Sequence, residues 1–146
     1  MKEKRKNHAR LLFDSRSVNE TFARAAVTAF VAPTDPTVAE LSDIKTAVSE
    51  AVTNCIVHAY KDSSGEILVD LSLYEDGMLR IAVTDHGCGI PDVAAAMTPL
   101  FTTGDPAERS GLGFSVMQSF MDRLHVTSRV GYGTRVIMTK QIHSRT

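Results

Sequence analysis

Ile44-Lys-Thr-Ala-Val-Ser-Glu-Ala-Val-Thr-Asn-Cys55 is the central part of the longest helical pattern in the chain. That pattern runs from about Val38 to Tyr60, and its apolar residues recur at the i, i+3, i+4, i+7 spacing of one helix face. Glu50 and Asn54 lie roughly 110–150° from the centre of this apolar face. We therefore expect a long helix that carries Glu50 and Asn54, one turn apart, on a polar flank. Its predicted buried face comprises Leu41, Ile44, Val48, Ala51, Val52, Cys55, Ile56 and Ala59.

A shorter helical pattern precedes this helix. Residues 9–14 are mostly apolar and predict an edge strand, and the helix that follows ends before Pro33. Arg24 lies about 200° around this helix from Phe22, so we expect its side chain to be exposed. Residues 1–8 are basic and polar, and we expect a flexible end there. The apolar face predicted for this helix comprises Val18, Phe22, Ala25, Ala26, Ala29 and Phe30.

Two β-hairpins are predicted in the second half of the chain, where the apolar period changes to two. In the first hairpin, the alternating residues 67–73 and 79–83 flank the turn Glu75-Asp-Gly77. In the second, the runs Leu124–Val130 and Thr134–Ile142 flank a glycine-containing turn. Both hairpins indicate an antiparallel sheet.

The segment between the hairpins is punctuated by proline and glycine. Residues 90–111 have little regular pattern beyond a short helix near Asp92–Met97, which is typical of a functional lid. Helical spacing returns from Gly113. The resulting order, β-α-α-β-β-lid-α-β-β, predicts an α+β two-layer sandwich over residues 1–146, with a mixed, mainly antiparallel sheet and helices on one face.

Composition narrows the function classes. The chain has 146 residues, enough for one domain, and a formal net charge of −1, which gives no reason to expect nucleic acid or a membrane surface as partner. No apolar run approaches the roughly 18 residues that span a bilayer. Cys55 and Cys88 lack metal-type spacing, so we expect two buried thiols. We therefore expect a soluble, cytoplasmic protein.

Two glycine clusters point to a phosphate-bearing ligand. Asp85-His-Gly-Cys-Gly89 follows a strand, and Ser110-Gly-Leu-Gly113 precedes a helix, where Gly111 and Gly113 let backbone N–H groups face an anion. Walker and protein-kinase motifs are absent from the sequence. Asp85 continues the phase of the apolar residues before it, so its carboxylate is expected on the core side, where it needs a polar partner.

These residue types suit nucleotide chemistry. The amide oxygen of Asn54 suits Mg²⁺ that phosphates also hold, and Glu50 can accept the proton of an attacking hydroxyl. Asp85 can accept a hydrogen bond from the amine of adenine, which favours ATP over GTP. Thr134 is placed to support that contact through its hydroxyl or a water. The alternatives are two solvated helix residues, a structural aspartate that caps the next turn, and an ordinary strand threonine.

Further candidates lie in the lid. Arg109 can neutralise a terminal phosphate, or it can be a solvent-facing arginine. Thr102 and Thr103 are expected to line the lid near the phosphates. His58 follows the helix pair by one turn; without a second ligand at metal spacing, we interpret it as a packing or capping residue.

The conjunction of these motifs resembles the N, G1 and G2 boxes of the GHKL ATPase/kinase superfamily, and Gly133-Thr134 resembles its last box. Within that superfamily the chain is similar to the sporulation anti-sigma F factors, which are also serine kinases. The resemblance covers residues 9 to 140. It rests on the boxes and on these segments: residues 19–24 (Asn-Glu-Thr-Phe-Ala-Arg), 58–60 (His-Ala-Tyr), 99–103 (Pro-Leu-Phe-Thr-Thr) and 108–114 (Glu-Arg-Ser-Gly-Leu-Gly-Phe).

The resemblance implies a Bergerat-type ATP-binding fold, with ATP or ADP and Mg²⁺ as cofactors and Glu50 as catalytic base. It implies nucleotide contacts by Asn54, Asp85, Gly87, Gly89, Thr102, Thr103, Arg109, Gly111, Gly113 and Thr134. It also implies a homodimer that binds a sigma factor of the sigma F type and phosphorylates an anti-anti-sigma protein on serine. The partner-binding helix would present Glu20, Phe22 and Arg24.

Two positions depart from the family pattern: Gly104 stands where lysine is common, and Ala59 stands where glycine is common. The first leaves open how the lid contacts phosphate or partner; the second is a packing change. Three other functions stay open at this point. They are a switch kinase of the general stress response, a nucleotide-responsive binding module without catalysis, and a detached ATP domain of a histidine kinase.

Overall fold

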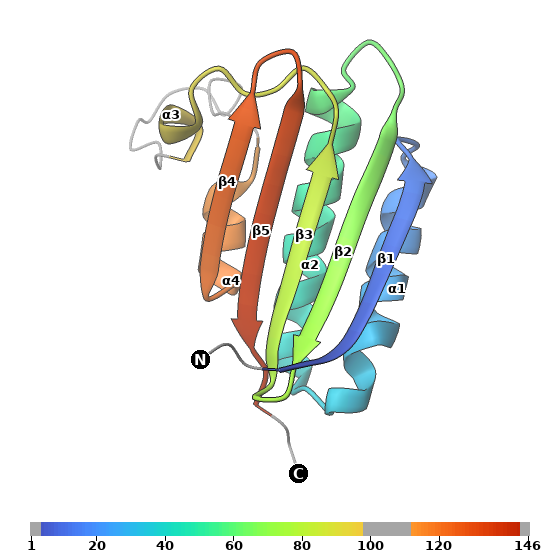
Figure 1. Ribbon diagram of the computed structural model, residues 1–146, viewed down its shortest axis with the longest axis vertical. Helices are drawn as coiled ribbons and strands as arrows, with labels where there is room; N and C mark the ends of the chain where they lie inside the picture. Colours follow the sequence, from blue (N-terminus) through green and yellow to red (C-terminus); the bar gives the residue numbers. More distant parts are fainter. Residues whose placement is uncertain (1–3, 98–111, 144–146) are drawn as a thin grey trace.

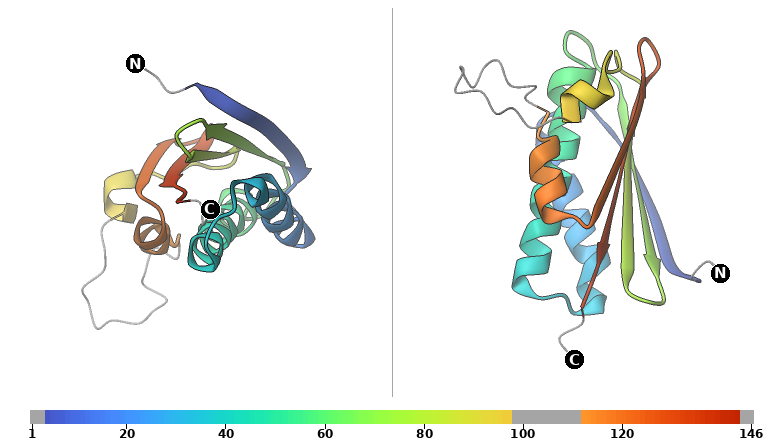
Figure 2. Two further views of the ribbon diagram at one scale, coloured as in Figure 1. Left: turned by 90° about the horizontal axis from the view of Figure 1, so that it is seen from below. Right: turned by 90° about the vertical axis from the view of Figure 1, so that its left-hand side faces the viewer.

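The computed structural model describes residues 4–97 and 112–143, which form a five-stranded sheet and a layer of helices on one of its faces (Figures 1 and 2). This confirms the predicted two-layer α+β architecture. The helices are α1 (Val18–Val31), α2 (Val38–Asn54), α3 (Val93–Met97) and α4 (Phe114–Phe120), with a 3₁₀ turn η1 (Ala32–Thr34) and a π-helical turn η2 (Cys55–Ala59). The strands are β1 (Arg5–Asp14), β2 (Glu66–Tyr74), β3 (Met78–Asp85), β4 (Arg123–Arg129) and β5 (Gly133–Gln141).

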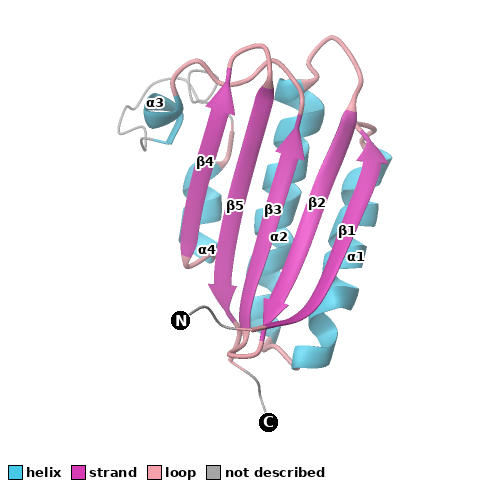
Figure 3. Cartoon of the chain, in the orientation of Figure 1, coloured by secondary structure: helices cyan, strands magenta, loops and turns pink. Residues whose placement is uncertain are grey.

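The strand order is β1-β2-β3-β5-β4, and all four neighbouring pairs are antiparallel (Figure 3). The predicted mixed sheet is therefore corrected to an antiparallel one among the described strands. The connections explain why. The chain reverses direction three times between β1 and β2, before α1, before α2 and before β2, so β2 returns antiparallel to β1. After the α4 crossover, β4 runs in the same direction as β3. The two strands do not pair, because β5 lies between them.

The core lies between the sheet and the helices. The predicted alternation of β2 and β3 is confirmed, because their apolar inner-face residues are at most 4% exposed. The largest side chains with less than 2% exposure come from both layers: Val27, Val31, Ile44, Val48, Val52, Ile67, Leu71, Leu79, Ile81, Phe114, Met117 and Met138. This packing fixes the helices against the sheet and holds the ends of α2 and β3 together.

Strand β1 is longer than predicted. It begins at Arg5 instead of residue 9, and His8 pairs with Ser72 of β2 in register. The His8 ring nitrogen Nε2 lies 3.0 Å from Asp70 Oδ1. The expectation of a flexible end is therefore wrong for residues 5–8, because the neighbouring strand offers them backbone partners.

The buried face of α1 differs from the prediction. Its buried residues are Ala23, Val27 and Val31, whereas Val18 is 61% and Phe22 48% exposed. In this alanine-rich helix both faces are apolar, so the periodicity does not decide which one packs. Phe22 instead lies at the rim, where its ring meets Phe13 edge-on at 6.0 Å between centroids.

Helix α2 has the predicted buried face, which includes Ile44, Val48, Ala51 and Val52. A capping box fixes its start: the Thr37 hydroxyl accepts from the Glu40 N–H at 3.0 Å, and Glu40 accepts from the Thr37 N–H at 2.9 Å. The predicted helix to Tyr60 continues through η2, where the Tyr60 N–H donates to the Cys55 carbonyl at 3.1 Å. This wider winding, which the sequence does not predict, is common at functional sites.

Within residues 4–97 and 112–143, no helix combines the length and the apolar character that crossing a bilayer requires.

Candidate functional site

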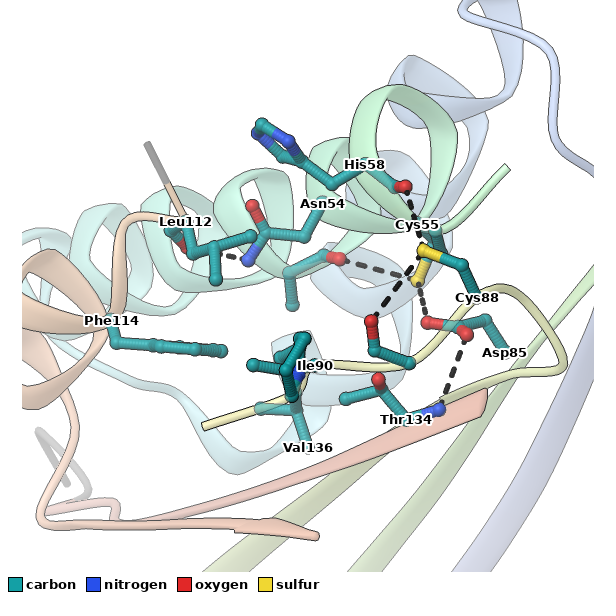
Figure 4. Close-up of a pocket in the computed structure, with 14 residues that line it drawn as sticks. Asn54, Cys55, His58, Asp85, Cys88, Ile90, Leu112, Phe114, Thr134 and Val136 are labelled. Atoms are coloured by element: carbon teal, nitrogen blue, oxygen red, sulfur yellow. Dashed lines mark hydrogen bonds between the residues drawn. The ribbon is translucent and has the colours of Figure 1, made fainter. Parts of the chain in front are cut away.

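A cavity of about 260 Å³ opens where the end of α2, the loop after β3, the start of α4 and strand β5 meet (Figure 4). We call it the main cavity. Its walls are mostly apolar, with a few polar groups that come from separate elements. The lining residues are Ala51, Asn54, Cys55, His58, Ala59, Asp85, Cys88, Gly89, Ile90, Pro91, Leu112, Phe114, Thr134 and Val136.

Asp85 is the buried charged group of the main cavity. It ends β3 with its side chain on the core side, as its phase predicts, and is 5% exposed. Its Oδ1 accepts hydrogen bonds from the Gly87 N–H at 2.9 Å and the Thr134 N–H at 3.2 Å. Its Oδ2 accepts from the Cys55 thiol at 3.5 Å. These donors compensate the burial of the carboxylate, and Oδ2 keeps the capacity to accept a stronger donor.

The Cys55 thiol is held in its protonated form. Burial raises the pKa of Cys55 well above its ordinary value, and the negative charge of Asp85 and the hydrogen bond to it raise the pKa further. A protonated thiol can donate to Asp85, whereas a thiolate would repel it. Cys55 therefore belongs to the site, although the sequence suggested only a core residue.

The loop after β3 passes close to two other backbone segments. Gly87 lies against the Ala59 carbonyl and Gly89 against the Arg129 carbonyl, and a Cβ at either position would collide with that carbonyl. Gly89 also has a φ of +80°, which side-chain-bearing residues rarely adopt. The two glycines thus let the loop fit between η2 and the β4–β5 turn.

Tyr60 and Ser128 hold this loop, and no sequence motif assigned a role in the site to either residue. The Tyr60 hydroxyl donates to the Glu66 carbonyl at 2.7 Å and accepts from the His86 N–H at 2.8 Å. Ser128 Oγ accepts from the Ile90 N–H at 2.8 Å. The signal that could have identified Ser128 is a hydroxyl residue placed opposite Thr134 by the predicted hairpin.

Thr134 connects β5 to both sides of the site. Its N–H binds Asp85, and its hydroxyl oxygen lies 2.7 Å from Ser128 Oγ, which also donates to the Gly133 carbonyl at 3.0 Å. The side chain lines the main cavity. Its position beside Asp85 matches the predicted supporting role, which stays a prediction for the ligand contact.

Glu50 and Asn54 both face the segment that precedes α4. Asn54 Nδ2 donates to the Leu112 carbonyl at 2.5 Å. The Glu50 carboxylate packs against Gly113, where a Cβ would collide with it and where φ is +65°. The predicted common flank is therefore confirmed, but the two residues differ in surroundings: Asn54 lines the main cavity and Glu50 does not.

Four predicted contact residues, Thr102, Thr103, Arg109 and Gly111, lie outside the described residues, as does Gly104. The predicted partner-binding residues lie on α1, away from the main cavity. Arg24, expected to be the exposed one, is instead half-buried, because it sits beside the packed residue Ala23 and its Nε pairs with Glu20 Oε1 at 3.3 Å.

Cys88 corrects the expectation of two buried thiols, since it is exposed. It occupies the loop at the mouth of the main cavity, where its Sγ lies 3.5 Å from the carbonyl oxygens of His58 and Gly89. Among the residues the structure describes, no group of three His, Cys, Asp or Glu side chains could hold a metal ion. A metal at this site would need ligands from elsewhere, such as phosphate and water.

The geometry fits a flat heteroaromatic base with an exocyclic amine. Ile90, Phe114 and Val136 offer apolar contact on the cavity walls, and Asp85 offers an acceptor that is fixed in place by three donors. The amide oxygen of Asn54 remains available at the side of the cavity nearest α4, because the described hydrogen bond uses only its NH₂ group.

Comparisons with known proteins identify the family of the chain. Residues 13–140 match the model of the histidine kinase-like ATPase domain. The anti-sigma F factor of Caldanaerobacter subterraneus subsp. tengcongensis is 55% identical over 93% of this chain and 94% of its own length. That of Geobacillus kaustophilus is 50% identical over 94% of each chain. The RsbU and RsbW domains of a Mycobacterium tuberculosis protein share the fold at 22% identity and a TM-score of 0.68, covering 94% of this chain and 32% of that one.

Proposed function

Since the chain belongs to the histidine kinase-like ATPase domain family, among the anti-sigma F factors, we propose that it is an anti-sigma factor and an ATP-dependent protein serine kinase. It would hold a sigma factor of the sigma F type in the cytoplasm and phosphorylate an anti-anti-sigma protein on serine. Nucleotide binding is the general property of the family; the partners and the serine acceptor are our proposal.

The arrangement of Asp85, Asn54 and Glu50 carries this proposal. Three groups follow one another from the sheet towards the start of α4. They are the buried carboxylate of Asp85, the free amide oxygen of Asn54 and the carboxylate of Glu50. Asp85, with Thr134 beside it, would hold the adenine of ATP, and Asn54 would ligate Mg²⁺. Gly87 and Gly89 shape the loop over the base. Gly113, together with Thr102, Thr103, Arg109 and Gly111 outside the described residues, would hold the phosphates.

ATP, when bound, supplies the phosphoryl group. The protein's own contribution to transfer is positioning and proton removal. Glu50 is half-buried and its carboxylate packs against Gly113, beside the segment that would hold the phosphates. We propose that it accepts the proton of the serine hydroxyl as general base. The apolar walls of the main cavity would exclude water from around the bound adenine.

The partner surface of the proposal is α1, with Glu20, Phe22 and Arg24. Phe22 is the large exposed apolar side chain of the three, and Arg24 adds a charge that Glu20 holds in a fixed direction. A homodimer would place two such surfaces on one particle, and a sigma factor could contact both. Aromatic and arginine side chains of this kind are the usual anchors of interfaces.

Phosphotransfer from labelled ATP tests the proposal directly. The purified chain, Mg²⁺ and the anti-anti-sigma protein of the same host should give one phosphorylated serine, identified by mass spectrometry. Co-purification from the host should recover a sigma factor. Recovery of a sigma factor without phosphotransfer would indicate a nucleotide-dependent binding module. Absence of both would reject the proposal.

A further inference from the structure

A second depression lies between α1 and α2, and Glu50 is one of its lining residues. This groove of about 410 Å³ is lined by Arg24 of α1 and by the polar side of α2 from Val38 to Glu50. We call it the α1–α2 groove. It differs from the main cavity in that polar side chains, rather than apolar ones, form most of its wall, including Ser42, Lys45, Thr46 and Ser49.

The two spaces share the helix α2 as a wall. Asn54, one helical turn later, lines the main cavity, and Glu50 lines the groove. A general base must lie on the side of the phosphoryl group from which the attacking hydroxyl arrives, opposite the leaving group. The adenine-binding end of the main cavity would lie beyond Asn54, so a hydroxyl that reaches Glu50 through the groove would approach from the side away from the adenine.

Hydrogen bonds hold the wall of the groove. Glu20 Oε1 accepts a short hydrogen bond from the Ser49 hydroxyl and pairs with Arg24 Nε at 3.3 Å. Arg24 is thereby held at the groove while its charge is partly compensated by Glu20. The same interactions join α1 to Ser49, the residue before Glu50, so they link the position of the groove wall to that of the Glu50 backbone.

Lys45 is the cation of the groove that has no such compensation. Its side chain is exposed, and it forms no ion pair or hydrogen bond with any residue in the described part of the chain. An uncompensated lysine in a polar groove favours a carboxylate of a partner. The far end of the groove offers apolar contact instead, since Val38 is 80% exposed and Leu41 lies beside it.

We propose that the α1–α2 groove binds the acceptor segment of the substrate protein, an extended stretch with its serine at Glu50 and an acidic side chain at Lys45. This rests on the proposed kinase function and names the substrate features that it requires. Lys45 precedes Glu50 by five residues, or about 7.5 Å along the helix axis. An extended chain covers that distance in about two residues, and the length of the lysine side chain adds reach. The acidic residue therefore lies within about four positions of the serine.

Charge reversal tests the proposal. Lys45→Glu should raise the KM for the anti-anti-sigma protein at least about tenfold, because like charges would meet in the groove. Lys45→Arg should retain wild-type behaviour. Lys61→Glu, a reversal at an exposed lysine outside the groove, is the matched control. Nucleotide affinity, measured separately by calorimetry, should be equal in all four proteins.

A compensating change identifies the contact. In the substrate variant, lysine replaces the acidic residue nearest the acceptor serine. The wild-type kinase should phosphorylate this variant poorly, whereas the Lys45→Glu kinase should phosphorylate it well. A photo-crosslinker at Thr46 should label the acceptor segment, whereas one at Lys61 should not. Crosslinking does not depend on catalysis, so it reports on the groove alone.

The outcomes separate the two claims. Phosphotransfer by the wild type with an unchanged KM for Lys45→Glu and no crosslink from Thr46 would overturn the groove while the kinase function stands. A crosslink from Thr46 without phosphotransfer would reject the kinase function and retain the groove as a docking site. A wild type that neither binds nor phosphorylates the protein would reject both.

Discussion

The Cys55 thiol donates a hydrogen bond to Asp85 Oδ2 across 3.5 Å, inside the wall of the main cavity. It is a weak donor, and its partner also accepts from the Gly87 and Thr134 N–H groups through Oδ1. The thiol therefore helps to orient Asp85 without saturating it. This leaves Oδ2 as the atom to which an adenine amine can donate.

The Cys55 thiol is expected to make the unfolding free energy decrease at alkaline pH. The folded state raises the pKa of the thiol, with burial as the main cause and the charge of Asp85 next. The contribution of the protonated thiol is fully present below the unfolded pKa of about 8.5 and is lost as the pH rises through the folded value. We expect the unfolding free energy to fall above pH 8.5, and to fall less for Cys55→Ser, whose hydroxyl does not ionise in this range.

Urea titrations from pH 7 to pH 10 measure this slope. Cys88→Ser is the matched control, because Cys88 is exposed. Equal slopes for the wild type and Cys55→Ser would show that the Cys55 thiol does not couple to folding.

Asp85→Asn should weaken ATP binding at least about tenfold, since a hydrogen bond to a charged group contributes about 1.5–3 kcal/mol. The amide can also turn a donor towards the amine. Isothermal calorimetry with Mg-ATP and Mg-GTP measures both the affinity and the discrimination. Equal affinity of the wild type for the two nucleotides would remove the assignment of Asp85 to adenine.

Glu50→Gln should retain nucleotide affinity and lose phosphotransfer by about 10²–10⁴-fold, because the shape of the side chain survives while the base does not. Glu75→Gln, in the exposed β2–β3 turn, is the control. Rates come from single-turnover transfer to the anti-anti-sigma protein. Wild-type transfer by Glu50→Gln would mean that another group removes the proton.

Tyr60→Phe should lower the unfolding free energy by about 1–3 kcal/mol, because the buried hydroxyl bonds both the Glu66 carbonyl and the His86 N–H. Tyr132→Phe is the control, since Tyr132 is 63% exposed and its ring, stacked under Arg129, is retained. Chemical denaturation measures both. Equal stability of Tyr60→Phe and wild type would show that the loop after β3 does not depend on this bridge.

The elements that could be predicted from the sequence are those whose apolar residues mark only one face. The alternation in β2 and β3 leaves no doubt about the buried face, and it also placed the Asp85 carboxylate in the core. The i, i+4 spacing placed Glu50 and Asn54 on one flank of α2. Periodicity is sufficient in these cases because the polar and apolar residues differ strongly.

Other features depend on tertiary contacts that no local pattern contains. The alanine-rich α1 could pack on either of two faces, and the contact with α2 selected Ala23 and Val27. The π-helical turn ends at Tyr60, whose hydroxyl accepts a hydrogen bond from the loop after β3. Ser128 acts through an N–H that the fold brings from 38 residues away.

Arg24→Ala tests whether α1 is the partner surface. Because the structure shows Arg24 half-buried and ion-paired, the expected effect on folding has to be considered first. The side chain is half-buried and paired with Glu20, but an ion pair at i, i+4 contributes only about 0.3–0.5 kcal/mol, so folding and ATP binding should be nearly unaffected. An arginine anchor at the centre of an interface contributes about 2 kcal/mol or more, roughly thirtyfold in affinity. If α1 is the shared docking site, ATP-loaded Arg24→Ala should bind both the sigma factor and the anti-anti-sigma protein more weakly in titrations.

Arg129→Ala, at the far edge of the sheet, is the control and should bind both normally. Unchanged binding of both partners to Arg24→Ala would remove α1 as their site, and loss of one alone would require separate sites.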